Sequence, residues 1–91
     1  PFGTGNEKPV FSLSGAAIAY ISAVGADKKH LRLGIQKNER QINCIGFYMG
    51  GLAKTLRTGD MIRLAFQMDI NTYQNNRAVQ LILKDIKKEE Q

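Results

Sequence analysis

The chain has 91 residues, of which 43% are hydrophobic, and its 13 lysines and arginines against 8 aspartates and glutamates give a net charge of +5. This length allows one small domain, and the apolar content is sufficient for a single core, so a disordered chain is excluded. The single cysteine excludes an intrachain disulfide and a thiolate zinc cluster, and it fits a reducing cytoplasm. The basic surplus favours a polyanionic partner such as nucleic acid, with a merely solubilising surface as the alternative.

The chain opens with a segment that is typical of a loop. The stretch PFGTGNEKPVF (residues 1–11) holds two prolines and two glycines and has no initiator methionine. Residues of these types interrupt helices and strands rather than forming them. We therefore expect residues 1–14 to be a junction from an upstream domain, residues 15–87 to be one folded domain, and residues 88–91 to be a frayed, charged tail.

Alternation of apolar and polar residues predicts five strands, over residues 16–24, 30–36, 40–48, 61–70 and 77–86. The first of them lies in an uncharged stretch at 15–26. That stretch is shorter than the ~20 residues that cross a bilayer, and it has no basic leader. We therefore expect a buried strand there, and no membrane partner.

The third and fourth predicted strands differ in the regularity of their patterns. In the third, Ile42 and Cys44 fall on one face and Ile45 and Phe47 on the other, which predicts a bulge or burial of both faces. The fourth strand alternates without a break. Its predicted core residues are Ile62, Leu64, Phe66, Met68 and Ile70.

Turns and one short helix separate these strands. Segments rich in glycine, asparagine and aspartate predict turns at 25–27, 37–39, 58–60 and 71–76, and LAKTL (52–56) predicts a helical turn. Five strands with one short helix between the third and the fourth is the element order of an OB-fold, a five-stranded Greek-key barrel. An SH3-like barrel lacks a helix at this position, and a two-sheet sandwich needs more strands. The predicted fold class is therefore an all-β OB barrel.

Four stretches, in order and at matching spacing, resemble one known family. PFGTGNEKPVF resembles that family's Pro-Phe-Gly-x-Gly-Asn-x-x-Pro-Val-Phe junction, and HLRLGI (30–35) resembles its second barrel strand. IGFYMGGLAKTL (45–56) resembles its Ile-Gly-Phe-x-Met-Gly segment, and DINTYQNNRAVQLILKDI (69–86) resembles its closing hairpin. The chain thus resembles the C-terminal OB domain of the RecJ family of single-strand-specific DNA exonucleases. Two residues depart from the family pattern: Tyr73 replaces the usual Trp, and Asn75 replaces the usual Gly.

The resemblance implies a single-stranded-DNA-binding module of a 5′-to-3′ exonuclease that acts in DNA recombination and repair. The nuclease chemistry would belong to a DHH-type core that uses two metal ions, Mn or Mg, held by Asp and His ligands. None of that ligand constellation occurs in these 91 residues, so we expect no catalytic residue, metal site or cofactor in them. The implied partners are single-stranded DNA, the catalytic core of the same parent chain and a single-strand-binding protein. A structural brace or protein-docking module with little DNA binding stays open as the alternative.

Three features of the sequence carry residue types found in active sites. His30 is the only histidine and follows Lys28 and Lys29 directly, which favours a histidine that faces solvent or DNA over a metal ligand or a catalytic base. Cys44 has no neighbouring base, which favours a packed thiol over a nucleophile. The pair at 50–51 lacks the lysine and serine of a phosphate-binding loop, so we expect these glycines to shape the strand exit.

OB-folds bind single strands across the second and third strands, between the first loop and the last hairpin, by means of basic side chains and stacking aromatic rings. The residues that fit this description are Lys28, Lys29, His30, Arg32, Arg40, Asn71, Tyr73, Asn75 and Arg77. We expect the ring of Tyr73 to stack on a base, because the turn pattern around it does not require an aromatic residue. Exposed basic residues and turn asparagines are also common without any ligand. Tyr48 and Met49 are assigned to a contact with the catalytic core.

Overall fold

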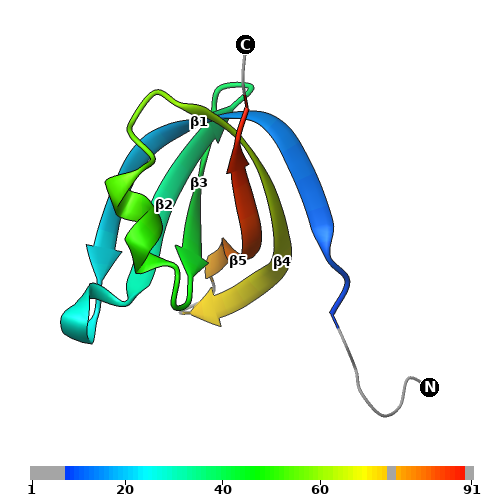
Figure 1. The fold of residues 1–91 in the computed structure, drawn as a ribbon. Coiled ribbons are helices and arrows are strands. Elements are labelled where there is room, and N and C mark those ends of the chain that lie inside the picture. Colours follow the sequence, from blue (N-terminus) through cyan, green and yellow to red (C-terminus); the bar gives the residue numbers. More distant parts are fainter. Residues whose placement is uncertain (1–7, 74–75, 90–91) are drawn as a thin grey trace.

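A computed structural model describes residues 8–73 and 76–89, which form five strands and two short 3₁₀ helices. The elements are β1 (Phe11–Val24), η1 (Ala26–Lys28), β2 (His30–Lys37), β3 (Arg40–Gly46), η2 (Gly50–Lys54), β4 (Met61–Tyr73) and β5 (Asn76–Lys88). The strands close into a barrel in the order β1-β2-β3-β5-β4, in which β3 and β5 run parallel and the other neighbours antiparallel (Figure 1). This is the OB topology, so the predicted all-β, five-stranded class is confirmed.

The longest strand, β1, serves two neighbours. Residues 11–17 pair with β4 and residues 17–24 pair with β2, and register shifts in both ladders bend the strand between them. The predicted start at residue 16 is therefore wrong, because β1 begins at Phe11. The alternation at 11–14 is short, follows a proline and stops at a glycine, so the pattern did not extend the strand upstream.

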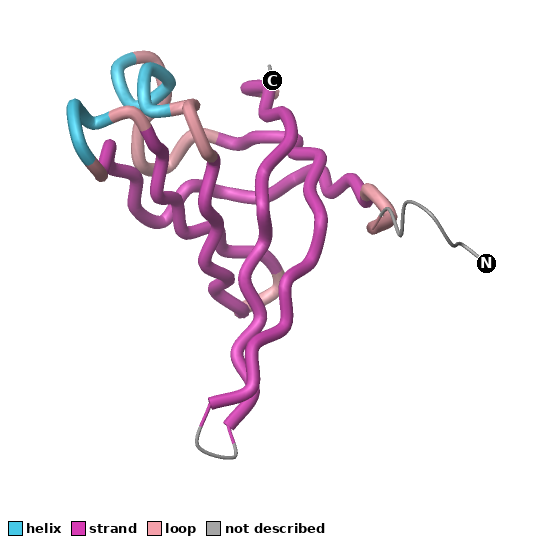
Figure 2. Tube along the Cα trace, turned by 90° about the horizontal axis from the view of Figure 1, so that it is seen from below, coloured by secondary structure: helices cyan, strands magenta, loops and turns pink. Residues whose placement is uncertain are grey.

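The strands β4 and β5 continue beyond the barrel as a two-stranded arm. Figure 2 shows them running side by side away from the other strands, and their pairing extends to Tyr73↔Asn76. The turn predicted at 71–76 is therefore wrong except at residues 74–75, which lie outside the described residues. Met68 and Ile70, predicted as core, are 40% and 51% exposed, because the strand keeps its alternation after it has left the barrel.

The third strand is simpler than its sequence pattern indicates. β3 pairs with β2 without a register shift, so the predicted bulge is absent. Ile45 faces outward and is half-buried, and Phe47 lies past the end of the strand with 53% of its surface exposed. The predicted helix between β3 and β4 is η2, a single 3₁₀ segment that begins at Gly50, and η1 was not expected at all.

The end of β5 is fastened to the barrel. The backbone N–H of Glu89 donates to the carbonyl oxygen of Met61 at 2.8 Å, and its Oε1 accepts the N–H of Gly15 at 3.0 Å. Lys88 is thus the last residue of β5 and Glu89 is bonded to the barrel, whereas fraying of residues 88–91 stays a prediction. The assignment of a junction to a catalytic core stays a prediction, and residues 1–7 lie outside the described part of the chain.

The barrel interior is filled by aliphatic side chains, together with the ring of Phe66 and one thiol. Leu31, Leu33 and Ile35 are fully buried on β2, as predicted, and Cys44 faces them from β3 with 1% of its surface exposed. Burial raises the pKa of the Cys44 thiol from 9.0 to about 12. The sulfhydryl is a packing group, as the sequence indicated.

The burial of Cys44 predicts that its thiol reacts slowly in the folded chain and that the free energy of unfolding falls at high pH. At pH 8 the Cys44 thiol of the folded chain should not react with a disulfide reagent, whereas the unfolded chain should react at once. Because the folded-state pKa is raised, the stabilisation is complete below pH 9.0 and is lost as the pH rises towards about 12. Titration with a disulfide reagent, with and without urea, measures the reactivity of the thiol. The loss of stability above pH 9 is measured for the unmodified chain and for Cys44→Ala, and the difference between them separates the effect of Cys44 from the titration of lysines and tyrosines. Rapid labelling of the folded chain would contradict the burial argument.

Candidate nucleic-acid interface

A tyrosine ring lies flat against the outer wall of the barrel. Tyr20 on β1 pairs with Gly34 on β2, and a Cβ built at Gly34 would lie only 2.7 Å from Cζ of that ring. The ring therefore covers the glycine backbone directly, which no other residue type would permit. On the far side of Gly34, the Tyr20 hydroxyl donates to Oδ1 of Asn43 on β3 at 2.6 Å. The ring is thus fixed at both ends on the outside of β1, β2 and β3.

Two residues before Gly34 on β2, Arg32 projects from the centre of the same outer surface of the barrel. It pairs with Ser22 on β1 and with Ile45 on β3, and Ile45 pairs in turn with Ile82 on β5. Arg32 is exposed, and no described carboxylate lies within ion-pair distance of its guanidinium. Its charge is therefore available to a ligand on this face.

We call this surface the outer face. Its outward residues on the described strands are Tyr20, Ser22, Arg32, Gly34, Gln36, Gln41, Asn43, Ile45, Gln80 and Ile82. This set contains amides, apolar groups, an aromatic ring and a cation, and it contains no carboxylate. Such a surface suits a polyanion with flat, partly apolar groups.

At one end of the outer face, the turn between β1 and β2 holds three of the predicted residues. Lys28 and Lys29 are exposed, and His30 is half-buried at the start of β2. The carbonyl oxygen of Lys29 accepts the N–H of Gly50 at 2.8 Å, which fastens the turn to η2. The lysines are therefore carried on a fixed backbone.

The other end of the outer face is bounded by the arm. Arg40, at the start of β3, lines a groove of about 520 Å³ between β3 and the arm. The remaining lining residues are Gln41, Ile42, Asn43, Met68 and Val79. Arg77 is exposed on the arm, where its backbone pairs with Thr72.

The remaining predicted contact residues lie partly or wholly outside the described part of the chain. Asn71 and Tyr73 belong to β4, but their side chains lie outside the described part, and Asn75 lies wholly outside it. The structure thus places Lys28, Lys29, His30, Arg32 and Arg40 along one wall and its two ends. Sequence reasoning missed Tyr20 and Asn43; the outward glycine at position 34 was the available signal, since a glycine on a strand often marks a close approach.

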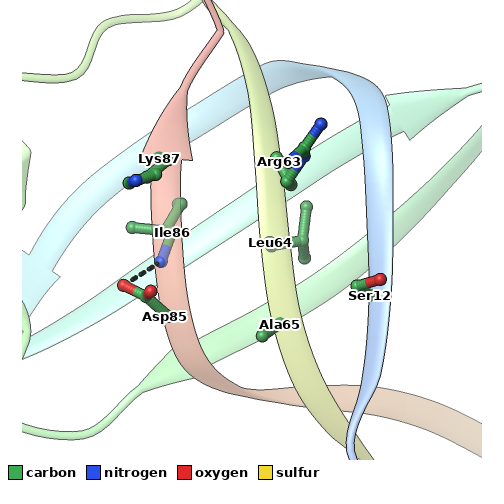
Figure 3. A pocket seen from close by; sticks show the side chains of 7 residues that line it. All are labelled: Ser12, Arg63, Leu64, Ala65, Asp85, Ile86 and Lys87. Atoms are coloured by element: carbon green, nitrogen blue, oxygen red, sulfur yellow. Dashed lines mark hydrogen bonds between the residues drawn. The ribbon is translucent and has the colours of Figure 1, made fainter.

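A smaller cavity lies elsewhere, between β1, β4 and β5. Its volume is about 80 Å³, and its lining residues are Ser12, Arg63, Leu64, Ala65, Asp85, Ile86 and Lys87 (Figure 3). Nε of Arg63 lies 3.9 Å from a carboxylate oxygen of Glu89, so its charge is partly compensated. This hollow is too small for a nucleobase, and we do not assign it to the interface.

Neither a metal centre nor a membrane span is found among the described residues. No three His, Cys, Asp or Glu side chains gather as a cation site there. Within the same ranges, no helix has the length and apolarity to cross a membrane.

The barrel is similar to known single-strand-binding structures. The mitochondrial single-stranded-DNA-binding protein Rim1 of S. cerevisiae matches with a TM-score of 0.71 at 14% identity, over 90% of this chain and 94% of that one. A replication protein A heterotrimer bound to single-stranded DNA matches with a TM-score of 0.56 at 16% identity, over 90% of this chain and 57% of the other. At these identities the likeness shows the OB-fold alone.

Sequence comparison identifies the family. The single-stranded-DNA-specific exonuclease RecJ of Bacillus subtilis (strain 168) is 33% identical over 85 residues, which are 93% of this chain and 11% of that protein. The chain therefore spans about a tenth of the length of this relative. The family model described as the RecJ OB domain matches residues 1–85, which confirms the resemblance read from the four sequence stretches. The chain belongs to the RecJ OB domain family.

Proposed function

We propose that this chain is a single-stranded-DNA-binding module of a RecJ-type exonuclease. The observation that supports this most directly is the outer face, where the fixed ring of Tyr20 lies near Arg32, which forms no ion pair with the described carboxylates, among outward strand residues that include no Asp or Glu in the described part of the chain. Aromatic rings stack on bases of any identity, and guanidinium groups bind phosphate, so such a face holds single strands without reading their sequence.

For the parent protein we propose the activity of the family: metal-dependent, 5′-to-3′ digestion of single-stranded DNA in recombination and repair, in the cytoplasm. The support is the identity to the B. subtilis exonuclease and the family match. The hydrolysis and its Mn or Mg ions would reside in a catalytic core, and this module would lengthen the path of the strand that the core degrades. A single-strand-binding protein is a further proposed partner.

A second function, a brace or docking module, is favoured by one observation. The arm exposes Met68, Ile70 and Val79 at 40%, 51% and 44% of their surfaces, on the side that continues the barrel core. Exposed apolar groups of this kind commonly meet a protein partner. DNA-binding measurements on the chain separate this function from the first.

The proposed function predicts a salt-dependent affinity that depends on Arg32. If about 3 to 4 cations contact phosphates, log affinity should fall with log salt with a slope of about −2 to −3, because each single-strand contact contributes about −0.7. Arg32→Ala should weaken binding and make the slope shallower by about 0.7. Anisotropy titrations of a labelled oligothymidylate at several salt concentrations measure both quantities.

Arg63→Ala is the matched control for this experiment. Arg63 is also an exposed strand arginine, but β4 is not a neighbour of β2 or β3 in the barrel. The control should bind like the unmodified chain. Absence of binding at low salt, or equal losses in the two variants, would favour the docking function instead.

A further inference from the structure

Two aromatic side chains stand in solvent immediately after β3. Phe47 is 53% exposed and Tyr48 is 78% exposed. The imidazole of His30 contacts both, with its centroid 5.5 Å from the Phe47 ring and 4.9 Å from the Tyr48 ring. The interplanar angles are 78° and 73°, so neither contact is a parallel stack that would cover a ring face completely.

The backbone holds this arrangement in place. The N–H of Tyr48 donates to Nδ1 of His30 at 3.0 Å, and the next residues are tied by the bond from the Gly50 N–H to the Lys29 carbonyl oxygen. Tyr48 has a φ of 63°, in the left-handed region that is uncommon for an aromatic residue. Unfavourable backbone conformations of this kind concentrate at functional sites, since the surrounding contacts must enforce them. In this cluster, the hydrogen bonds to His30 and Lys29 hold the ring of Tyr48, its most exposed ring, in the solvent.

The cluster is continuous with the outer face and carries the same sign of charge. His30 lies two residues before Arg32 on β2, and Phe47 lies two residues after Ile45, the partner of Arg32 on β3. Lys28 and Lys29 are exposed directly beside His30, and Asp27 is the one acidic residue of this turn. Exposed rings beside a turn that carries two lysines match the two parts of a nucleotide, its base and its phosphate.

We infer that Tyr48 and Phe47 form a stacking platform for a base of single-stranded DNA, with Lys28 and Lys29 on the adjoining phosphates. This inference rests on the proposed function and extends the path of the strand beyond β2 and β3 to the η2 end of the barrel. It replaces the expectation that Tyr48 contacts the catalytic core. A stacking platform differs from a protein-docking patch in one property. The platform requires a flat ring, whereas a docking patch requires apolar surface of any shape.

Three substitutions at position 48 distinguish these two requirements. Tyr48→Phe keeps the ring and should bind an oligothymidylate of about 16 nucleotides within twofold of the unmodified chain. Tyr48→Ala and Tyr48→Leu should both lose about 5- to 100-fold in affinity, because leucine supplies apolar surface without a ring. Phe47→Leu is a second, independent variant and should weaken binding in the same direction. Urea unfolding of each variant shows that the losses occur in folded protein, since both rings lie outside the core.

Tyrosine emission gives a readout that docking would not change. The chain has three tyrosines and no tryptophan, so quenching by a stacked base is directly visible. Tyr48→Phe should remove part of the quenching while it preserves affinity. If Tyr48→Leu binds as well as the unmodified chain, or if no substitution of Phe47 or Tyr48 matters while Arg32→Ala weakens binding, the platform is wrong and the proposed function stands. If the unmodified chain binds no oligonucleotide, both are wrong.

Discussion

Replacing Gly50 with alanine should lower the free energy of unfolding by about 2–4 kcal/mol, whereas the same change at Gly51 should alter it by less than about 0.5 kcal/mol. A Cβ at Gly50 would overlap the carbonyl oxygen of Lys28 and lie 2.8 Å from the carbonyl carbon of Lys29. These are backbone atoms, so no side-chain rotation relieves the clash. Either the turn that carries both lysines moves away, or the bond from the Gly50 N–H to the Lys29 carbonyl oxygen breaks.

The neighbouring glycine makes this comparison well controlled. A Cβ at Gly51 would meet nothing within 4 Å, and both residues belong to the same 3₁₀ segment. Urea denaturation of the two variants therefore separates steric overlap from the general effect of alanine on a helical turn. Because the overlap is with the turn of Lys28 and Lys29, Gly50→Ala should also weaken binding of single strands. Equal stabilities of the two variants would show that the turn is not packed against η2 as described.

Regular alternation predicted the fold well, since it reports directly on which side of a strand is buried. On β2, the inward positions 31, 33 and 35 and the outward Arg32 all follow from the period of two. The same rule failed on β4, where Met68 and Ile70 keep the alternation but have no barrel beneath them. Alternation indicates that a stretch forms a strand with two different faces, and it does not indicate where that strand leaves the barrel core.

The candidate site was harder to predict, because it depends on strand registers that a single sequence does not contain. Ala16 and Ile18 are buried on β1, so an unbroken period of two would also turn Tyr20 inward. A register shift between Ile18 and Tyr20 reverses the face, and the ring emerges over Gly34. The exposure of the basic residues could be predicted without the strand registers, because lysine and arginine are exposed almost wherever they occur. The sequence therefore indicated the exposed basic residues of the outer face and did not indicate the ring of Tyr20 on it, and the role of both in binding stays a prediction.

Replacing Gly34 with alanine should destabilise the chain by about 1–3 kcal/mol, and removal of the Tyr20 ring should abolish this cost. A Cβ at Gly34 would lie 2.5 Å from Cδ2 and 2.7 Å from Cζ of Tyr20, so the ring must leave the wall and its bond to Asn43 must break. In a Tyr20→Ala background the space above Gly34 is open, and alanine suits a strand better than glycine does. The two changes should thus be coupled by about 1–2 kcal/mol in a double-mutant cycle measured by urea unfolding.

The same cycle, measured by DNA titration, tests what the ring does. Gly34→Ala and Tyr20→Ala should each weaken binding of an oligothymidylate by about 1–3 kcal/mol, the free energy of one stacked base. The double variant should bind no more weakly than either single variant, because each change removes the same stacked ring. Tyr20→Phe keeps the ring over Gly34 but lacks the hydroxyl that donates to Asn43, so it should retain most of the affinity. Additive losses in the double variant would mean that Gly34 contributes to binding independently of the ring. If Tyr20→Ala is folded and binds as well as the unmodified chain, the assignment of Tyr20 to the interface is wrong.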